Sequence, residues 1–155
     1  MDISAFLEHL QHSPGYAGQV VHQEDVPSRE ARYGRLRQPL EPRLETALRN
    51  PGIDALYDHQ VAAIDGARAG QNTMVATGPA SGKSLCYHLP VLEASLLDDS
   101  ARSLYVFPTK ALSQDQLRSV RALCGDSLPV QTDIFDGDTP RNARNQIKGS
   151  AQVVI

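Results

Sequence analysis

Near the middle of this chain, a turn of small residues joins a strand-like segment to a helical pattern, and few folds accommodate that order. Residues 73–77 (Thr-Met-Val-Ala-Thr) are apolar and β-branched, which predicts a short buried strand. Residues 78–82 favour a tight turn. Leucines then recur at helical spacing, at Leu85, Leu89, Leu92 and Leu96. Pro90 falls inside this pattern and should bend the helix or remove one hydrogen bond.

The same alternation continues to the end of the chain. Residues 104–107, 130–135 and 153–155 are predicted strands, and the helix after the first of them places apolar residues at Leu112, Leu117, Val120 and Leu123. Asp138 or Thr139, followed by Pro140, is a typical helix start. Alternating strands and helices predict an α/β fold with a parallel sheet flanked by helices. A chain that ends inside a buried strand would leave a sheet edge uncovered, so we expect a longer protein.

The first part of the chain has weaker patterns. A helix is predicted by the spacing of Ile3, Phe6, Leu7 and Leu10. Residues 12–39 have no clear period and are interpreted as an extended arm. Apolar residues 40–48 predict a short helix that ends at Asn-Pro-Gly (residues 50–52). We therefore divide the chain into an N-terminal extension, 1–52, and an α/β portion, 53–155. In that portion Asp58 is expected to cap a helix that runs to about Arg68 and ends at Gly70.

Residues 77–84 (Thr-Gly-Pro-Ala-Ser-Gly-Lys-Ser) carry the clearest chemistry, since a strand followed by this turn and a helix is the context of a Walker A phosphate loop. Small residues let the backbone N–H groups point into one hollow, and the helix adds its positive end there. Lys83 would supply charge for the β- and γ-phosphates, and Ser84 a hydroxyl for Mg²⁺. The strict pattern has glycine where this chain has Thr77. The alternative is a chance Gly-Lys-Ser after a small-residue turn.

Composition favours a soluble domain over a membrane or secreted protein. Apolar residues make up 41% and charged residues 21%, which is typical of a soluble globular domain. No apolar run is long enough to span a membrane, and no signal peptide is evident. Cys86 and Cys124 lack metal-type spacing and predict a reduced, cytoplasmic setting, with both as small core residues. A net charge of −3 argues against coating nucleic acid by bulk charge but allows a local basic groove.

Four segments, in order, resemble the DEAD/DEAH-box helicases of superfamily 2. Residues 57–60 (Tyr-Asp-His-Gln) resemble the Q motif and residues 76–84 motif I, where threonine at the first position is tolerated. Residues 107–112 resemble motif Ia, and residues 136–140 resemble the segment after the third strand. The resemblance implies an incomplete RecA-like P-loop NTPase domain that binds ATP and Mg²⁺.

The details are most similar to a subgroup of DNA helicases that often carry a C-terminal zinc-binding domain. Their phosphate loop also reads Ala-Ser-Gly-Lys-Ser, followed by a run like Leu-Cys-Tyr-His-Leu-Pro. The arm, at residues 19–22 and 27–31, is similar to that subgroup as well. The resemblance therefore covers nearly the whole chain and implies DNA rather than RNA as the partner, with no membrane partner.

The resemblance also assigns roles to single residues. Gln60 would read the adenine edge, Tyr57 would lie near the base, and Lys83 and Ser84 would serve catalysis, with Ser84 on the metal. The nucleotide site would thus comprise Tyr57, Gln60, Thr77, Gly78, Pro79, Ala80, Ser81, Gly82, Lys83 and Ser84.

Some of these roles have plainer alternatives. Pro108, Thr109 and Lys110 would grip a phosphate of single-stranded nucleic acid, unless Thr109 is only a helix cap beside a solvated lysine. Asp138 and Thr139 are expected to cap a helix rather than to contact the strand. Arg141 and Arg144 are expected to be solvated charges, with contact to a backbone phosphate as the alternative. The histidines, His59 among them, are expected to have no metal role.

A motor of this family also needs an acidic DEAD- or DEAH-type segment and a second RecA-like domain, and neither occurs in these residues. We therefore expect an N-terminal piece of an ATP-dependent DNA helicase or translocase, inactive by itself. Two alternatives stay open: another P-loop NTPase such as a small kinase, or a catalytically dead module that binds nucleotide or nucleic acid.

Overall fold

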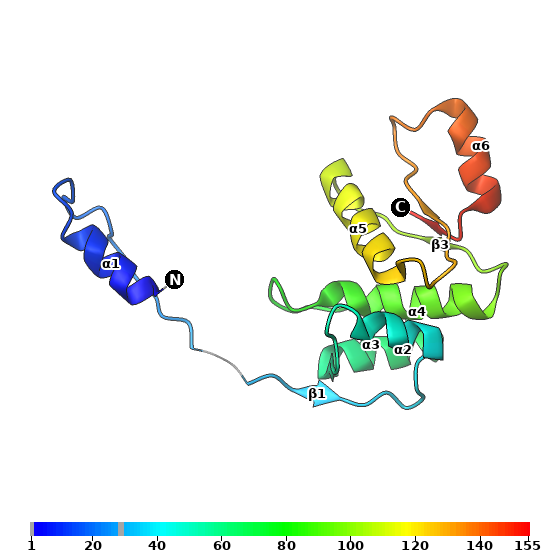
Figure 1. Ribbon diagram of the computed structural model, residues 1–155, viewed down its shortest axis with the longest axis horizontal. Coiled ribbons are helices and arrows are strands. Elements are labelled where there is room, and N and C mark those ends of the chain that lie inside the picture. The colour runs from blue at the N-terminus through cyan, green and yellow to red at the C-terminus, as the bar shows by residue number, and fades with distance from the viewer. Residues whose placement is uncertain (1, 28–29) are drawn as a thin grey trace. The chain divides into compact units, whose positions relative to one another are not determined.

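The computed structural model describes residues 2–27 and 30–155. The chain divides into two compact units, Met1–Glu30 and Ala31–Ile155, and each is treated by itself (Figure 1). Two residues of the arm segment 27–31, Ser28 and Arg29, lie outside the described residues. No helix in the described part of the chain is long and apolar enough to cross a membrane.

The first unit contains helix α1 (Ile3–Gln11), which confirms the N-terminal prediction. Asp2 caps it, because its carboxylate accepts the backbone N–H groups of Ser4 and Ala5 at 2.9 and 3.3 Å. None of the helix's residues is buried, and the side chains of Ile3 and Phe6 are 67% and 45% exposed.

The second unit begins with residues that the sequence assigned to the extension. Strand β1 (Tyr33–Gly34) pairs antiparallel with β2 (Leu56–Tyr57), so that Tyr33 lies opposite Tyr57. Helix α2 (Pro42–Arg49) starts at a proline and is capped by Glu41. Its apolar face is buried. Residues 31–52 are therefore part of the second compact unit rather than a separate arm.

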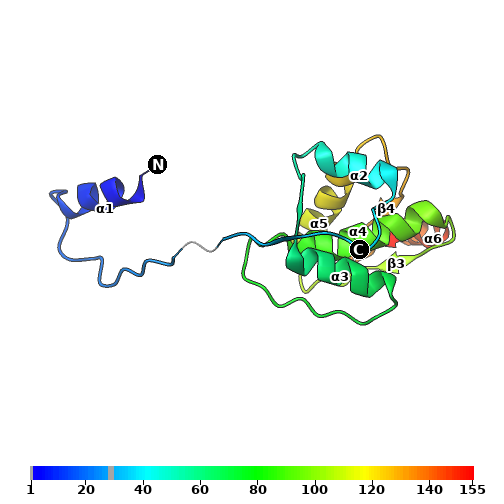
Figure 2. The same ribbon diagram turned by 90° about the horizontal axis from the view of Figure 1, so that it is seen from below.

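Four further helices follow: α3 (Asp58–Arg68), α4 (Lys83–Leu97), α5 (Lys110–Cys124) and α6 (Arg141–Ser150). Figures 1 and 2 show α3 and α4 side by side. Helix α4 continues through Pro90. Most of the predicted leucine positions form or border the core, but Leu112 is 38% exposed. Cys86 and Cys124 are buried free thiols. The fully buried residues of largest volume are Leu44, Ile64, His88, Leu89, Leu92, Val120 and Val153.

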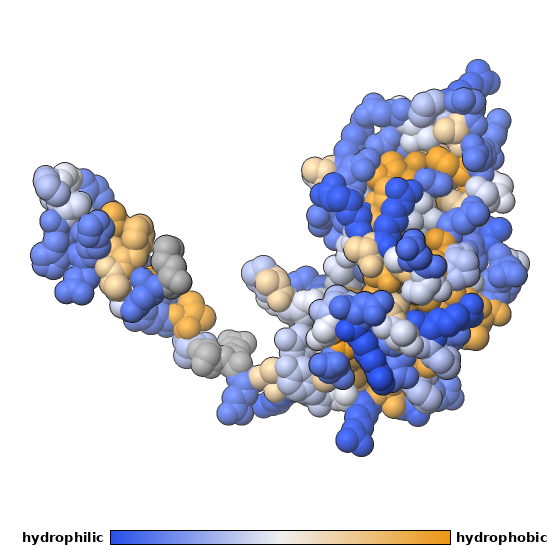
Figure 3. All heavy atoms as spheres, in the orientation of Figure 1, coloured by the Kyte–Doolittle hydropathy of each residue, from blue (hydrophilic) through white to orange (hydrophobic). Residues whose placement is uncertain are grey.

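The sheet is parallel and three-stranded. Its order is β3 (Ser103–Leu104), β5 (Val153–Val154) and β4 (Thr132–Asp133). Ser103 and Thr132 both lie level with Val153, so the last segment of the chain is the middle strand and not an edge. A parallel sheet with flanking helices confirms the α/β prediction. Apolar patches still interrupt the hydrophilic surface of this unit (Figure 3), and Leu104 and Val106 are 72% and 81% exposed.

One predicted strand is wrong. Residues 73–77 are not a strand, Met74 is 93% exposed, and the segment pairs with no strand among the described residues. β-Branched composition cannot by itself satisfy the backbone N–H and C=O groups, which need a neighbouring strand. The other strands exist but are paired over only two residues each.

Two predicted helix starts also differ. Tyr57 occupies the N-cap position of α3, and Asp58 is its first helical residue. Pro140 occupies the N-cap position of α6, so neither Asp138 nor Thr139 caps it. The Thr139 hydroxyl is instead turned back to the N–H of Asp136, at 2.9 Å, and therefore closes the preceding loop.

Candidate nucleotide site

The phosphate loop curls because two of its residues adopt left-handed backbone conformations. Ala80 has φ 54° and Gly82 has φ 71°, and Gly82 is the N-cap residue of α4. Gly78, Pro79 and Ala80 are exposed at the crest of the loop. The loop thus leads directly into a helix N-terminus, where backbone N–H groups are free to bind an anion.

Side chains close the loop on itself. The Thr77 and Ser81 hydroxyl oxygens are 2.6 Å apart, and the Ser81 hydroxyl donates to the Gly78 carbonyl at 2.9 Å. Threonine at the first motif position therefore has a structural part here, since a glycine would lack this cross-loop hydrogen bond. Ser84 lies in the first turn of α4 and is half-buried.

Lys83 lies folded over the same loop. Its ammonium donates to the carbonyl oxygens of Thr77, at 3.0 Å, and Gly78, and it is 3.4 Å from the Ser81 hydroxyl. These are weak neutral acceptors for a full positive charge, and a phosphate would be a stronger one. The structure thus brings Thr77, Ser81 and Lys83 together around one small volume.

Gln60 is only 2% exposed and braces the loop from α3. Its Nε2 donates to the Gly82 carbonyl at 2.9 Å, and its Oε1 accepts the Tyr57 N–H at 2.8 Å. A Cβ atom at position 82 would lie 2.6 Å from Gln60 Nε2. Gly82 is therefore needed both for its backbone angle and for the close approach of Gln60.

Two residues beside the loop were missed by the sequence analysis. Tyr33, Tyr57 and His59 stack in order, with ring centroids 5.1 and 5.7 Å apart and interplanar angles of 17° and 12°. His59 Nε2 is 3.0 Å from the Ser81 carbonyl oxygen. The position of His59 beside Gln60 could have indicated it, but Tyr33 is brought here only by the pairing of β1 with β2.

The candidate strand-binding residues lie at the start of α5. Thr109 is the N-cap, with its hydroxyl accepting the Leu112 N–H at 3.3 Å. Lys110 is exposed and forms an ion pair with Asp138, and the hydrogen bond that its ammonium donates to the Asp138 carboxylate raises the pKa of Lys110. Pro108 is exposed just before them.

Arg144 is not the solvated charge expected. Its guanidinium donates to the carbonyl oxygens of Thr139 and Asp136 at 2.9 and 3.1 Å and lies 5.3 Å from the centre of the Phe135 ring. It therefore fixes the loop after β4, and Arg141 stays exposed.

A cluster of polar side chains is formed by residues of α4, by Tyr105, which follows β3, and by a residue of α5. His88 Nδ1 is 3.1 Å from the Tyr105 hydroxyl, and Tyr87 donates to Gln116 Oε1 at 2.7 Å. The Nε2 atom of His88 is buried without a hydrogen-bond partner. Burial lowers the pKa of His88 to about 4 and raises the pKa of Tyr105.

Two known proteins resemble this chain over most of its length and are much longer than it. The ATP-dependent helicase YprA of Bacillus subtilis is 36% identical over 88% of this chain, which covers 18% of that protein. The ATP-dependent helicase hrq1 of Schizosaccharomyces pombe is 36% identical over 99% of this chain, which covers 15% of it. The chain thus spans less than a fifth of the length of these relatives.

A solved helicase structure is also similar to this chain. The DUF1998 helicase MrfA, in a crystal structure with DNA and AMPPNP, superposes with a TM-score of 0.84 at 33% identity, covering 98% of this chain and 21% of that one. The family model for DEAD/DEAH box helicases matches residues 57–155. That match starts at Tyr57, the middle ring of the aromatic stack, and includes the phosphate loop. It covers more than half of the residues. The chain belongs to the DEAD/DEAH box helicase family.

Proposed function

We propose that this chain is the ATP-binding N-terminal portion of an ATP-dependent DNA helicase or translocase. The observation that carries the proposal is the phosphate loop at the N-terminus of α4, with two left-handed residues and Lys83 held over it by neutral carbonyls. In this proposal residues 53–155 form the first part of the RecA-like domain. Residues 1–52 form an extension, of which residues 31–52 belong to the same compact unit.

ATP–Mg²⁺ binds with its triphosphate in this loop. Lys83 exchanges the Thr77 and Gly78 carbonyls for the β- and γ-phosphates, which are stronger acceptors. Ser84 would supply one oxygen to Mg²⁺ next to the bound phosphates. A single protein oxygen suits this ion, which keeps most of its own water.

The base lies on the Tyr57 side of the loop. Gln60 uses one N–H and one lone pair for Gly82 and Tyr57, so a second N–H and a second lone pair remain for the adenine edge. Tyr33, an outer ring of the stack, is 58% exposed and is suited to contact with a flat base, whereas Tyr57 lies between Tyr33 and His59 and would lie near the base without stacking on it.

The nucleic-acid strand lies over the start of α5. Pro108, Thr109 and Lys110 present an exposed helix N-terminus and a cation, the usual partners of a backbone phosphate. DNA is favoured over RNA because MrfA was solved with DNA and further relatives are named DNA helicases. A cytoplasmic location is consistent with two buried free thiols.

Nucleotide binding is tested by titrating the 155-residue chain with ATP and Mg²⁺ in a calorimeter. Lys83→Ala should weaken ATP binding at least about tenfold, since it removes a charged hydrogen-bond donor to phosphate. Lys148→Ala is the matched control, because it removes the same charge from α6 and should bind like the wild type. Equal affinity of the wild type and Lys83→Ala would reject this site.

The motor activity is tested on the natural protein with a forked DNA duplex. Unwinding that needs ATP and disappears in Lys83→Ala is the expected result. Nucleotide binding without hydrolysis in the natural protein would instead identify a binding module.

A further inference from the structure

Two neighbouring side chains at the start of α3 hold two successive carbonyl groups of the phosphate loop. His59 Nε2 lies 3.0 Å from the Ser81 oxygen, and Gln60 Nε2 lies 2.9 Å from the Gly82 oxygen. A carbonyl oxygen only accepts, so His59 Nε2 must carry a hydrogen and donate it.

The direction of these carbonyls fixes the direction of the next amides. In a planar trans peptide unit the C=O bond and the following N–H bond point opposite ways. The Ser81 and Gly82 oxygens are drawn toward α3, so the N–H groups of Gly82 and Lys83 point away from it. These are the amides at the N-terminus of α4 that a phosphate would meet.

His59 is itself held from outside the loop. Its ring stacks on Tyr57, which stacks on Tyr33 of β1. The imidazole donor therefore has a fixed direction before any ligand arrives, as a preorganised site requires.

We propose that His59 is a positioning residue for the phosphate-binding amides of Gly82 and Lys83. It acts on the triphosphate of any nucleotide through the loop and does not read the base, which distinguishes it from the adenine-reading role proposed for Gln60. The inference rests on the proposed function, because it requires that the loop bind phosphate.

The test compares three ligands in the presence of Mg²⁺: ATP, GTP and inorganic tripolyphosphate. His59→Phe keeps a ring against Tyr57 but loses the donor, and His59→Gln keeps a donor but loses the ring. His59→Phe should weaken all three ligands by the same factor, about three- to tenfold, as expected for one lost hydrogen bond. His59→Gln should recover most of that loss.

A second readout is direct and needs no ligand. The Gly82 N–H belongs to the peptide unit whose carbonyl His59 holds, so in ¹⁵N-labelled chain the Gly82 amide resonance should shift in His59→Phe and return toward its place in His59→Gln. Amides of α6 should not move, which shows that the variant is folded.

The possible results separate the two proposals. Wild type that binds neither ATP nor tripolyphosphate rejects the phosphate site and this inference together. If the wild type binds both ligands and Lys83→Ala binds them more weakly, the phosphate site is supported. The His59 inference is then wrong if His59→Phe binds tripolyphosphate with wild-type affinity. It is also wrong if His59→Phe weakens the binding of ATP but not of the other two ligands.

Discussion

Gly82 combines a left-handed backbone with the close approach of another side chain. Its φ is 71°, and an added Cβ would lie 2.6 Å from Gln60 Nε2. Gly78, in the same loop, has ordinary φ and no atom within 4 Å of such a Cβ. Substituting each of the two glycines in turn therefore distinguishes a position that requires glycine from one that only lies in the same loop.

Gly82→Ala should lower the free energy of unfolding by about 1–3 kcal/mol, because alanine is strained at this φ and Gln60 must give up its bond to the Gly82 carbonyl. Gly78→Ala should change it by less than about 0.5 kcal/mol. Urea unfolding followed by circular dichroism, without nucleotide, measures both. Equal effects at the two positions would mean that the backbone angle of Gly82 is not a constraint.

His88 makes the stability of the chain depend on pH. Burial lowers its pKa to about 4 in the folded chain, against an ordinary value of 6.5, so the unfolded chain takes up the proton first. The stability is fully present above about pH 6.5 and is lost progressively as the pH falls toward 4.

Between pH 7 and pH 5 the free energy of unfolding should fall by about 2 kcal/mol from His88 alone, since each unit of pH counts for about 1.4 kcal/mol while one state is protonated and the other is not. The measurement is urea unfolding at the two pH values for the wild type and for His88→Gln, which cannot titrate. The free energy of unfolding should fall by about 2 kcal/mol more in the wild type than in His88→Gln over this pH range. Parallel slopes would show that His88 has the same pKa in the folded and the unfolded chain.

At the scale of single elements, the start of α5 presents a lysine, Lys110, whose proposed phosphate ligand would compete with the Asp138 carboxylate. Lys110 is proposed to bind a strand phosphate, yet it is paired with Asp138, and both side chains are exposed, at 56% and 80%. An exposed pair contributes little and exchanges easily, so a phosphate has only to displace one carboxylate.

Asp138→Asn should therefore bind single-stranded DNA about two- to fivefold more tightly than the wild type, because the competitor and its repulsion of phosphate are both removed. Fluorescence anisotropy with labelled oligothymidylate at low and moderate salt measures this. Asp126→Asn, which changes the net charge equally at an exposed loop, is the control. If both variants tighten binding alike, net charge and not the Lys110 pair is responsible.

The helices could be predicted from sequence because their causes are local. Helix α1 has its cap at Asp2, α2 has a proline at its first position, and α5 has Thr109 at its N-cap, all within a turn of the helix they start. Strands have no such local cause. Residues 73–77 have the right composition but no paired neighbour in the described part of the chain, whereas the similar residues Val153 and Val154 are paired on both sides.

The candidate site divides in the same way. The loop from Thr77 to Ser84 is one continuous segment, so its chemistry is legible in the sequence. His59 reaches Ser81 across 22 positions, and Tyr33 reaches Tyr57 through a two-residue strand pairing. The adjacency of His59 to Gln60 is the one signal in the sequence, and tertiary packing creates both contacts.

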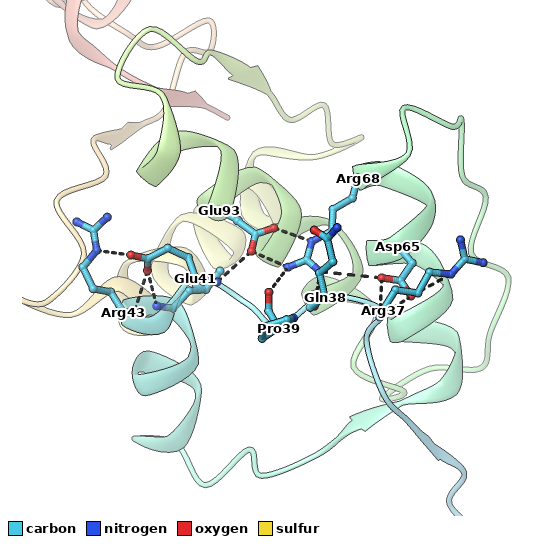
Figure 4. A network of polar contacts seen from close by, with 9 residues as sticks. Arg37, Gln38, Pro39, Glu41, Arg43, Asp65, Arg68 and Glu93 are labelled. Atoms are coloured by element: carbon cyan, nitrogen blue, oxygen red, sulfur yellow. Dashed lines mark hydrogen bonds and ion pairs between the residues drawn. The ribbon is translucent and has the colours of Figure 1, made fainter.

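At the scale of the second unit, one ion pair ties three segments together. Arg68 of α3 donates to both carboxylate oxygens of Glu93 of α4, at 2.7 and 2.6 Å, and to the carbonyls of Gln38 and Pro39 (Figure 4). Glu93 also accepts the Glu41 N–H at 3.0 Å. The side chains of Arg68 and Glu93 are only 18% and 10% exposed, and the pairing raises the pKa of Arg68.

This pair holds α3 against α4, and those helices carry the two sides of the nucleotide site, Gln60 and Lys83. Glu93→Gln should lower the free energy of unfolding by about 2–3 kcal/mol, because the largely buried guanidinium loses the carboxylate that accepts two of its hydrogen bonds and keeps only the longer, 4.0 Å contact with Asp65. Arg118→Met, which breaks an exposed pair with Asp115, should cost less than about 0.5 kcal/mol.

The double variant Arg68→Met/Glu93→Leu distinguishes the effect of losing the ion pair's charges from the effect of changing how α3 and α4 pack. Apolar side chains of similar volume remove the uncompensated charge, so the double variant should regain part of the stability that Glu93→Gln loses. Its ATP affinity, measured in the same preparation, shows whether the hydrogen bonds also set the spacing of the site. Restored stability with weakened ATP binding would mean that Arg68 and Glu93 fix how far α3 lies from α4, and therefore how Gln60 meets the loop. Restored stability with unchanged ATP binding would mean that apolar packing alone sets that distance.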